Sequence, residues 1–581
     1  MAEEKLFVRK ATGLVREIGA ITAIIIVMAN TIGLGWQKRV FQFTGKAPLP
    51  ENQFLAGIPP MTMAFILGGI AILLSVLAVS VLAAAMPRSG GGYVVISRII
   101  GPVWGFLGSW LEFFSIAWSF GIIAVAVFEG IYQIMGPIAF GISFGTPAGI
   151  DSHVFLFIVG LVLVAAFTFV GIFGVKLAGI LLQAMFWVPT ILTFYVFGLL
   201  SQATTSTVTT GMANILGHAP VDYVNAALAQ GMDAKAATVG GYWGAVSTAL
   251  VGAYFAYIGY AASTFVAGEI KQANKSLPKT LVFASVLIIA LYVGISLVAG
   301  GAVRGVASTT LANGNTYSLF SAWSYLSYGA GDLTTAGLPT VQLWTTTVAG
   351  LTGSAIGLGS VNVLLVVFGV FWIANDIPPF ILTASRILFA MSFDRVLPTP
   401  LANINDRFHS PVNAVILTGI VAILGCFSES GVVDNGKAWN LGGNTVLSSI
   451  LGSSGGVAIT DIQDSLFFTL FTLSLVILPL RASRRQIFDT APYKPGGKWG
   501  MVALGMAGFI ANLFVDYEFA VAPGGDFGLA TVNWSSSTLF FDIFPLFFMI
   551  ILAVVGVVIY FYHRTRRGIN YSTIFAQIPP E

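Results

Sequence analysis

Long apolar runs alternate with polar stretches along almost the whole chain. A helix needs roughly 17–25 apolar residues to cross a bilayer, and hydropathy indicates twelve such runs. They lie at 17–36, 61–85, 103–135, 153–174, 177–200, 243–268, 280–302, 358–391, 412–427, 464–480, 499–515 and 541–562. We interpret each run as a membrane-spanning helix, so the predicted fold class is an all-α integral membrane protein with twelve transmembrane helices.

Three polar stretches between the runs are rich in Gly, Ser, Thr and Asn, and they predict long loops at 201–240, 303–357 and 428–463. The charged stretch before the first run is followed by no small-residue cleavage site, so the first run is predicted to be a retained span and not a signal peptide. No soluble domain is predicted, and residues 1–581 are expected to form a single membrane domain.

Two of the twelve runs are interrupted near mid-depth. The first contains Asn30-Thr31 followed by Gly33 and Gly35, and the sixth contains the polar stretch 254–264. Irregular backbone inside a bilayer is tolerated only where it lines a cavity or is buried in protein. One glycine-rich span alone would favour close helix packing, but two interrupted spans five apart indicate an inverted-repeat transporter with its binding site at the breaks.

This pattern predicts a five-plus-five organisation. The first five-helix repeat would cover 13–200, the second would cover 243–480, and two accessory helices would follow at 499–562. The breaks in the first helix of each repeat would then face one another near the membrane midplane.

Composition removes most other classes of protein. Only 9% of the 581 residues are charged, against about 25% in soluble domains, and the mean hydropathy is +0.88. Too few charges are present to coat a soluble protein of this size, so a soluble enzyme, a nucleic-acid binder and a disordered chain are excluded. A net charge of +3 provides no field for nucleic acid, and the single cysteine, Cys426, excludes an internal disulfide.

Lysine and arginine predict the orientation. With twelve spans, 21 of the 27 basic residues fall on the side that holds both termini. The positive-inside rule therefore predicts a multi-pass protein of the cell (plasma) membrane with both termini cytoplasmic and the three long loops outside. The six basic residues on the other side are Lys38, Arg39, Lys46, Lys235, Arg304 and Lys437.

Four stretches resemble the amino acid–polyamine–organocation (APC) superfamily of permeases. They are Met86-Pro87-Arg88-Ser89-Gly90-Gly91-Gly92-Tyr93 with Ser97-Arg98 and Gly101-Pro102; Tyr257-Ile258-Gly259-Tyr260 with Gly268-Glu269-Ile270-Lys271 and Leu277-Pro278; Ser385-Arg386-Ile387-Leu388-Phe389-Ala390 with Asp394-Arg395-Val396-Leu397-Pro398 and Ser410-Pro411-Val412-Asn413-Ala414; and Pro492-Tyr493-Lys494-Pro495-Gly496-Gly497. The resemblance implies a leucine-transporter-like 5+5 inverted repeat, alternating access, no cofactor and no enzymatic activity.

The resemblance also implies a substrate site. In this superfamily the substrate carboxylate binds amides of the broken first helix, and the ammonium group binds carbonyls of the first and sixth. At matching positions stand Asn30, Thr31, Ile32, Gly33, Leu34 and Gly35, facing Phe255, Ala256, Tyr257, Ile258 and Gly259. No lysine or arginine lies in the middle of a span, which fits a neutral amino acid better than an acidic one. Tyr257 and Tyr260 would close over the substrate or shape its pocket; aromatic packing is the alternative.

Asp376 stands midway along the eighth predicted span, before Pro378-Pro379. A carboxylate at that depth is functional by default because it is costly to bury, and the prolines remove backbone hydrogen bonds beside it. We expect Asp376 to take up a proton; the alternative is a structural aspartate that accepts bonds from nearby backbone amides.

Four other charged residues are candidates for coupling or gating. Glu112, in the third span, resembles a Trp–Ile–Glu element of some relatives, and a structural pairing is the favoured interpretation there. Glu269 closes the sixth span, where it would form an inner gate with Arg88 or Arg386; a solvated cytoplasmic face is the alternative. Glu129, near an outer end, would simply reach water.

At the positions that bind the coupling ion in relatives, this sequence departs from the patterns of the superfamily. Proton-coupled relatives carry a lysine in the fifth helix, where Pro189 or Thr190 stands here, and sodium-coupled relatives use hydroxyls in the eighth, where none occurs before Thr383. A proton bound by Asp376 is the favoured coupling ion, and sodium is less favoured. Enzyme signatures such as HExxH, G-x-S-x-G and a P-loop are absent from the sequence, as are filter-like repeats of a channel.

The sequence thus predicts a secondary active transporter that imports amino acids by proton symport. The alternatives are an amino acid exchanger and a polyamine or amine carrier, for which Asp376 would bind the ammonium group. A membrane-embedded enzyme would require convergent catalytic side chains, which the sequence does not provide. The expected partners are the amino acid, the proton and the lipid bilayer, with no nucleic acid and no metal.

Overall fold

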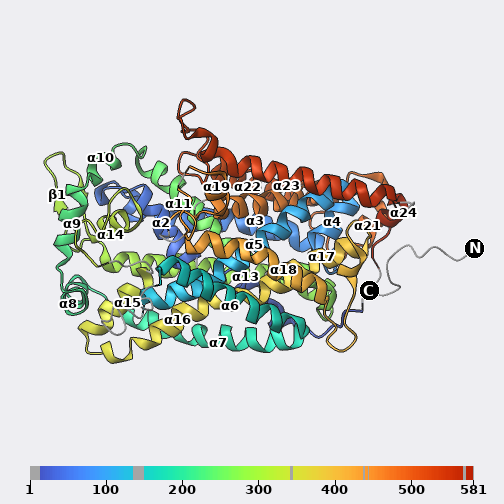
Figure 1. The fold of residues 1–581 in the computed structure, drawn as a ribbon, viewed down its shortest axis with the longest axis horizontal. Helices are drawn as coiled ribbons and strands as arrows, with labels where there is room; N and C mark the ends of the chain where they lie inside the picture. Colours follow the sequence, from blue (N-terminus) through green and yellow to red (C-terminus); the bar gives the residue numbers. More distant parts are fainter. Residues whose placement is uncertain are drawn as a thin grey trace, which may run out of the picture.

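Long helices lie side by side along the long axis of the molecule (Figure 1). The computed structural model describes residues 13–33, 35–134, 150–339, 344–435, 439–442, 444–453, 455–566 and 571–579. Within them, 11 helical stretches are long and apolar enough to cross a membrane, with α11–α12 and α16–α17 each counted as one stretch. The chain is therefore a mainly helical, multi-pass membrane protein.

These stretches contain α3 (Pro60–Ala85), α5 (Pro102–Ile134), α6 (Ser152–Ile172), α7 (Gly174–Ser201), α11 (Gly241–Tyr257), α12 (Ala262–Phe265), α13 (Ala273–Val303), α16 (Val363–Ala374), α17 (Ile377–Phe393), α18 (Val412–Ser430), α20 (Gly455–Ile477), α22 (Gly497–Ala520) and α23 (Leu539–Arg566). The most enclosed are α5, α11 and α20, whereas α6, α7 and α23 keep most of their surface free for lipid.

The first predicted span is broken, and its helical structure continues beyond the predicted end at residue 36. Helix α1 (Ala20–Ala29) has 10 residues, about 15 Å at 1.5 Å per residue, which is half of the ~30 Å hydrocarbon core. After a break, the π-helix η1 (Gly35–Arg39) and α2 (Val40–Lys46) continue the chain. The count of twelve spans and the five-plus-five repeat stay predictions.

One end of the bundle is covered by short elements (Figure 1), and we refer to it as the capped end. Its elements are η2 (Glu51–Gln53), η3 (Leu55–Gly57), α8 (Thr205–Leu216), α9 (Pro220–Ala229), α10 (Met232–Ala236), the antiparallel pair β1 (Thr309–Thr310) and β2 (Thr316–Tyr317), α14 (Leu319–Tyr328), α15 (Trp344–Ala355) and η6 (Gly359–Val361). The short helix α19 (Val446–Leu451) packs against α20 and α23.

The prediction of three long loops is therefore wrong. Polar residues in these stretches begin helices: the Thr204 hydroxyl accepts a hydrogen bond from the Thr207 amide at 3.2 Å, which satisfies an amide that the first turn of α8 leaves free. Helix α15 is polar in sequence yet buried over most of its length. Hydropathy misses such helices because their neighbours are protein and not lipid.

Helix α20 also differs from its predicted span of 464–480. It begins at Gly455, and the polar residues Asp461, Gln463 and Asp464 lie buried within it. The helix packs against α5 and α22, so its polar residues face protein. The predicted boundary is wrong because hydropathy counts apolar residues and not the neighbours that each side chain meets.

The opposite end, which we refer to as the terminal end, holds α4 (Gly92–Ile99), α21 (Arg485–Thr490) and α24 (Tyr571–Ala576) (Figure 1). The remaining elements of the described residues are η5 (Ala267–Glu269), η7 (Thr399–Ala402) and η8 (Ala482–Arg484). The segment after α23 is attached there: Phe575 is buried, Arg98 lies over its ring at 4.9 Å, and Arg88 Nε donates to the Pro579 carbonyl at 2.8 Å.

A buried carboxylate joins two loops of the capped end. Glu51 accepts hydrogen bonds from the Ser318 hydroxyl and, at 3.2 Å, from the Gly305 amide. Burial raises the pKa of Glu51 to about 7 from an ordinary value near 4.5. Because the folded protein keeps this proton longer than the unfolded chain does, the stabilisation is complete below pH 4.5 and is lost as the pH rises to about 7.

We expect Glu51→Gln to reduce the fall in melting temperature between pH 5 and pH 8 by on the order of 2 °C. The matched control is Asp233→Asn at the same end, because hydrogen bonds from Asn315, Tyr317 and Asn313 lower the pKa of Asp233, so that this group stays ionised across the window. A variant with the same pH profile as the original protein would contradict the prediction.

Candidate functional site

The first helix breaks where the sequence predicts. Helix α1 ends at Ala29, and the Thr31 hydroxyl donates back to the Val27 carbonyl at 2.8 Å. The backbone then turns through Ile32 and Gly33 before η1 begins at Gly35; Leu34 lies outside the described residues. The break interrupts the regular helical ladder, and the amides from Asn30 to Gly33 donate to carbonyls of Ile26, Met28 and Thr31.

The sixth span has a matching break. Helix α11 ends at Tyr257, Ile258 is extended, and Gly259 has φ +96° before α12 resumes at Ala262. A side chain on Gly259 would collide with the backbone and amide group of Asn30, so glycine is required both by its conformation and by this close approach. The two breaks therefore lie directly against each other.

Tyr292 on α13 joins the two breaks. Its hydroxyl lies 2.6 Å from the Thr31 carbonyl oxygen and 2.9 Å from the Ala256 carbonyl oxygen. The side chain is buried, and its ring lies against those of Trp36, Phe65 and Tyr257. The sequence pattern does not indicate a site role for Tyr292, because one tyrosine inside an apolar run is typical of packing.

Two adjoining cavities lie at the breaks. The first we name the break cavity; its lining includes Asn30, Thr31, Gly33, Gly35, Phe255, Ile258 and Asp376. The second we name the acidic cavity; its lining includes Asn30, Glu112, Ile258, Gly259, Thr383 and Asp464. Asn30, Ser119, Ile258 and Phe380 line both, so the two cavities adjoin.

Most of the predicted substrate residues thus line these cavities, and three do not. Ile32 and Ala256 are buried outside both linings, although the Ala256 carbonyl is the one that Tyr292 contacts. Tyr257 lines neither cavity, and its hydroxyl donates to the Phe65 carbonyl at 2.9 Å. The packing alternative therefore describes Tyr257 better than a role over the substrate.

Asp376 lies in a second interruption, between α16 and α17. Pro378 and Pro379 are in the first turn of α17, where helix amides have no partner inside the helix, so their missing N–H groups are tolerated. The carboxylate lies against Gly33, where any added side-chain carbon would overlap it. Among the described residues Asp376 makes no capping bond and its Oδ1 has no hydrogen-bond partner. The predicted alternative, an aspartate held by backbone amides, is not what the structure shows.

Glu112 and Asp464 face the acidic cavity from α5 and α20. Both are buried, and Glu112 Oε2 has no hydrogen-bond partner. Within the described ranges neither forms an ion pair, so the structural pairing favoured for Glu112 is not observed there. Asp464 was missed as a site residue because it appeared at the boundary of a predicted loop.

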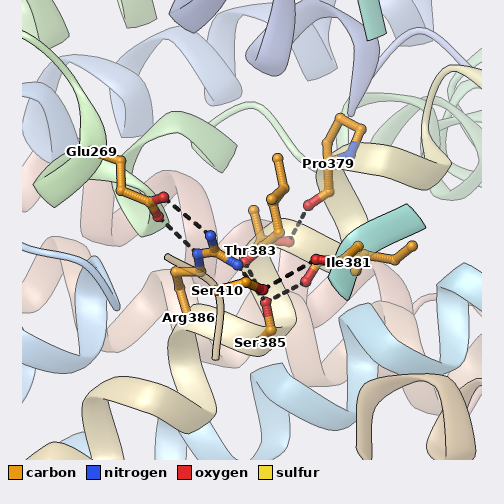
Figure 2. A network of polar contacts seen from close by, with 9 residues as sticks. Glu269, Pro379, Ile381, Thr383, Ser385, Arg386 and Ser410 are labelled. Carbon is orange, nitrogen blue, oxygen red and sulfur yellow. Dashed lines mark hydrogen bonds and ion pairs between the residues drawn. The ribbon is translucent and has the colours of Figure 1, made fainter. Parts of the chain in front are cut away.

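At the terminal end, Glu269 pairs with Arg386. Arg386 Nε and Nη2 donate to the two carboxylate oxygens at 2.8 and 3.1 Å, and Nη1 donates to the Ser385 hydroxyl at 3.0 Å (Figure 2). Both charged side chains are at most 1% exposed. Of the two predicted partners of Glu269, the structure brings Arg386 to it, whereas Arg88 binds the Pro579 carbonyl.

Further contacts close the bundle beside this pair. Arg98 binds the Asp394 carboxylate with both terminal nitrogens, one of them at 2.8 Å. The Ile18 amide donates to the Glu269 carbonyl at 3.0 Å, and the Lys271 amide donates to the Ile18 carbonyl at 2.9 Å. The segment before α1 is therefore bonded to the segment after α12, so that these two parts would move together.

Glu129 differs from its prediction. Instead of reaching water, it accepts a hydrogen bond from Lys38 Nζ at 2.7 Å, and Glu429 lies 3.2 Å from the same nitrogen. This ion-pair cluster joins η1 to α5 and α18 on the far side of the break cavity from Glu269 and Arg386.

Comparison with known proteins agrees with this architecture. The family model described as amino acid permease matches residues 18–578. The chain is 23% identical to the serine/threonine exchanger SteT of Bacillus subtilis (strain 168), over 71% of this chain and 76% of that protein. It is 24% identical to an uncharacterized transporter of Mycobacterium tuberculosis (strain H37Rv), over 70% of this chain and 72% of the other. The chain therefore belongs to the amino acid permease family, and it is an amino acid transporter and not an enzyme.

Proposed function

We propose that the protein imports amino acids across the cell membrane by alternating access, with the substrate backbone bound between the breaks of the first and sixth helices. The observation that supports this best is the direct contact of Gly259 with Asn30 beside two cavities that share lining residues. In broken helices of this kind, helix N-termini suit a carboxylate, and unwound backbone carbonyls suit an ammonium group. Leu34 and the other residues of the first break belong to this proposal.

The proposal includes the orientation of the helix bundle in the membrane. Basic residues gather at the terminal end, among them Arg88, Arg98, Lys271, Arg386 and Arg481, so this end is cytoplasmic by the positive-inside rule. The pairs Glu269–Arg386 and Arg98–Asp394 would then form the inner gate. In this proposal, the two pairs keep the pathway closed toward the cytoplasm.

Asp376 is our proposed proton-coupling residue. Its carboxylate contacts the break at Gly33, so its charge state acts directly on the backbone that binds substrate. Exchange without proton coupling is the second candidate, because a relative is named as a serine/threonine exchanger. The two candidates differ in what drives uptake.

We expect Asp376→Asn to abolish proton-driven uptake and to leave exchange intact, because the amide cannot release or take up the proton. The test uses proteoliposomes with and without an inward proton gradient, and the gradient-driven excess should fall at least tenfold. Asp542→Asn, an exposed aspartate in α23, is the matched control. Unchanged gradient-driven uptake in the Asp376 variant would remove this residue from coupling, and uptake that depends only on internal amino acid would replace symport with exchange.

The substrate class is tested by ligand-induced stabilisation. Purified protein is heated with each of the twenty amino acids and with common polyamines, and a bound ligand raises the melting temperature. We expect at least one amino acid to stabilise the protein. Stabilisation by polyamines alone would favour an amine carrier, and no stabilisation by any of these compounds would contradict the proposal.

A further inference from the structure

We propose that the substrate carries a second cationic group, an ammonium or guanidinium on its side chain, and that Glu112 and Asp464 bind this group in the acidic cavity. The inference rests on the proposed function, and it names the class of substrate. It replaces the expectation of a neutral side chain, which depended only on the lack of lysine and arginine at mid-span.

The first support is a pair of carboxylates without a counter-charge. Glu112 is 1% exposed and Asp464 is 5% exposed, and they reach one cavity from two different helices. In the part of the chain that the structure describes, no lysine or arginine lines this cavity or pairs with either acid. A buried charge is retained only where a partner offsets its loss of hydration, and a cationic ligand would be that partner.

The Asn30 side chain gives a second line of support. Asn30, in the first break, is 6% exposed and lines the acidic cavity, and its Oδ1 has no hydrogen-bond partner among the described residues. Glu112 Oε2 is likewise without one. The cavity thus presents acceptor oxygens from the first helix, α5 and α20, which an N–H donor on a ligand would satisfy.

The remaining walls favour an organic cation over a metal ion. Phe265, Phe380 and Phe468 line the same cavity, and ring faces attract ammonium and guanidinium groups. Among the described residues, no group of three or more His, Cys, Asp or Glu side chains is placed to hold a metal ion.

The position of the cavity relates it to the amino acid backbone. Ile258 and Asn30 stand between the acidic cavity and the break cavity and line both. A substrate whose carboxylate and ammonium groups occupy the breaks therefore places its side chain toward Glu112 and Asp464. Lysine, arginine and ornithine have this shape and charge.

The test compares ligands that differ in the side-chain charge alone. Equilibrium binding to the purified full-length protein is measured for lysine, arginine, norleucine and Nε-acetyl-lysine. We expect the better of lysine and arginine to bind at least tenfold more tightly than norleucine or Nε-acetyl-lysine. Equal affinity for the charged and uncharged ligands would overturn the inference. The same result is expected if Glu112 and Asp464 bind protons and no part of the substrate.

Glu112→Gln and Asp464→Asn keep the shape of each side chain and remove one charge. We expect each to lower the preference for lysine over norleucine at least fivefold while norleucine affinity stays within twofold. Glu518→Gln is the matched control, because Glu518 is a buried carboxylate of α22 that accepts a hydrogen bond from Ser247 at 2.8 Å and lies outside this cavity. An unchanged preference in both cavity variants would overturn the inference.

The outcomes separate this inference from the proposed function. If neutral amino acids bind and the charged ones show no advantage, the inference fails and amino acid transport stands. If no amino acid binds at all, both fail. Should either variant not fold, the ligand series on the unmodified protein still decides the question.

Discussion

Replacing Gly33 with valine is expected to abolish substrate binding and to reduce uptake at least about 100-fold, the cost of displacing reacting or binding groups by about an ångström. Any side-chain carbon at this position would overlap the Asp376 carboxylate. The backbone of the first break and the carboxylate cannot both keep their places, so the amides that face the break cavity would shift. Even Gly33→Ala should lose most of its affinity.

The measurement is amino acid uptake in proteoliposomes, together with ligand-induced thermal stabilisation of the purified variant. Gly179→Val on α7 is the matched control, because a side-chain carbon there would meet no atom within 4 Å. If the Gly33 variants folded and bound substrate with the original affinity, the site would have to lie away from the first break.

Removing one partner of the Glu269–Arg386 pair is expected to cost about 3–5 kcal/mol of unfolding free energy, since it leaves an uncompensated buried charge. In Glu269→Gln, the Arg386 guanidinium would keep only weaker neutral contacts such as that with Ser385. Figure 2 shows that Glu269 supplies both charged contacts to this guanidinium. The loss of stability should be almost independent of salt because water does not reach the pair.

Melting temperature in detergent, measured at low and high salt, tests this expectation. The double variant Glu269→Leu and Arg386→Met should recover most of the lost stability, because an apolar pair of similar volume can replace a buried ion pair. The control is Asp489→Asn, which breaks the Arg485–Asp489 pair whose side chains are 83% and 58% exposed; an exposed pair of this kind contributes less than about 1 kcal/mol. An equal effect of the buried and the exposed change would contradict the assigned role.

The breaks were predictable because their signals are local. Asn30 and Gly33 interrupt an otherwise apolar run, and Gly259 does the same in the sixth span. Helix continuity depends on residues three or four positions apart, so the sequence itself contains the information. The elements of the capped end were not predictable in the same way, since α15 is polar in sequence and becomes a buried helix only through its neighbours.

The site was predictable in part. Asp376 stood out as an acid within an apolar run, and the structure places it against Gly33. Asp464 did not stand out because it lies near polar residues, and Tyr292 did not because tyrosine is common in packed helices. Both act through residues that are far away in sequence: Asp464 shares a cavity with Glu112, and Tyr292 contacts Thr31.

The sequence by itself determined that the chain is a membrane protein. It also determined the positions at which the first and sixth helices break, and the family to which the chain belongs. These properties follow from composition, from local helix chemistry and from motifs such as Gly90-Gly91-Gly92. Only the tertiary structure decided that Glu269 pairs with Arg386 and that Glu112 and Asp464 share one cavity. Such contacts depend on how whole helices pack, and position along the chain does not state which faces of two distant helices meet.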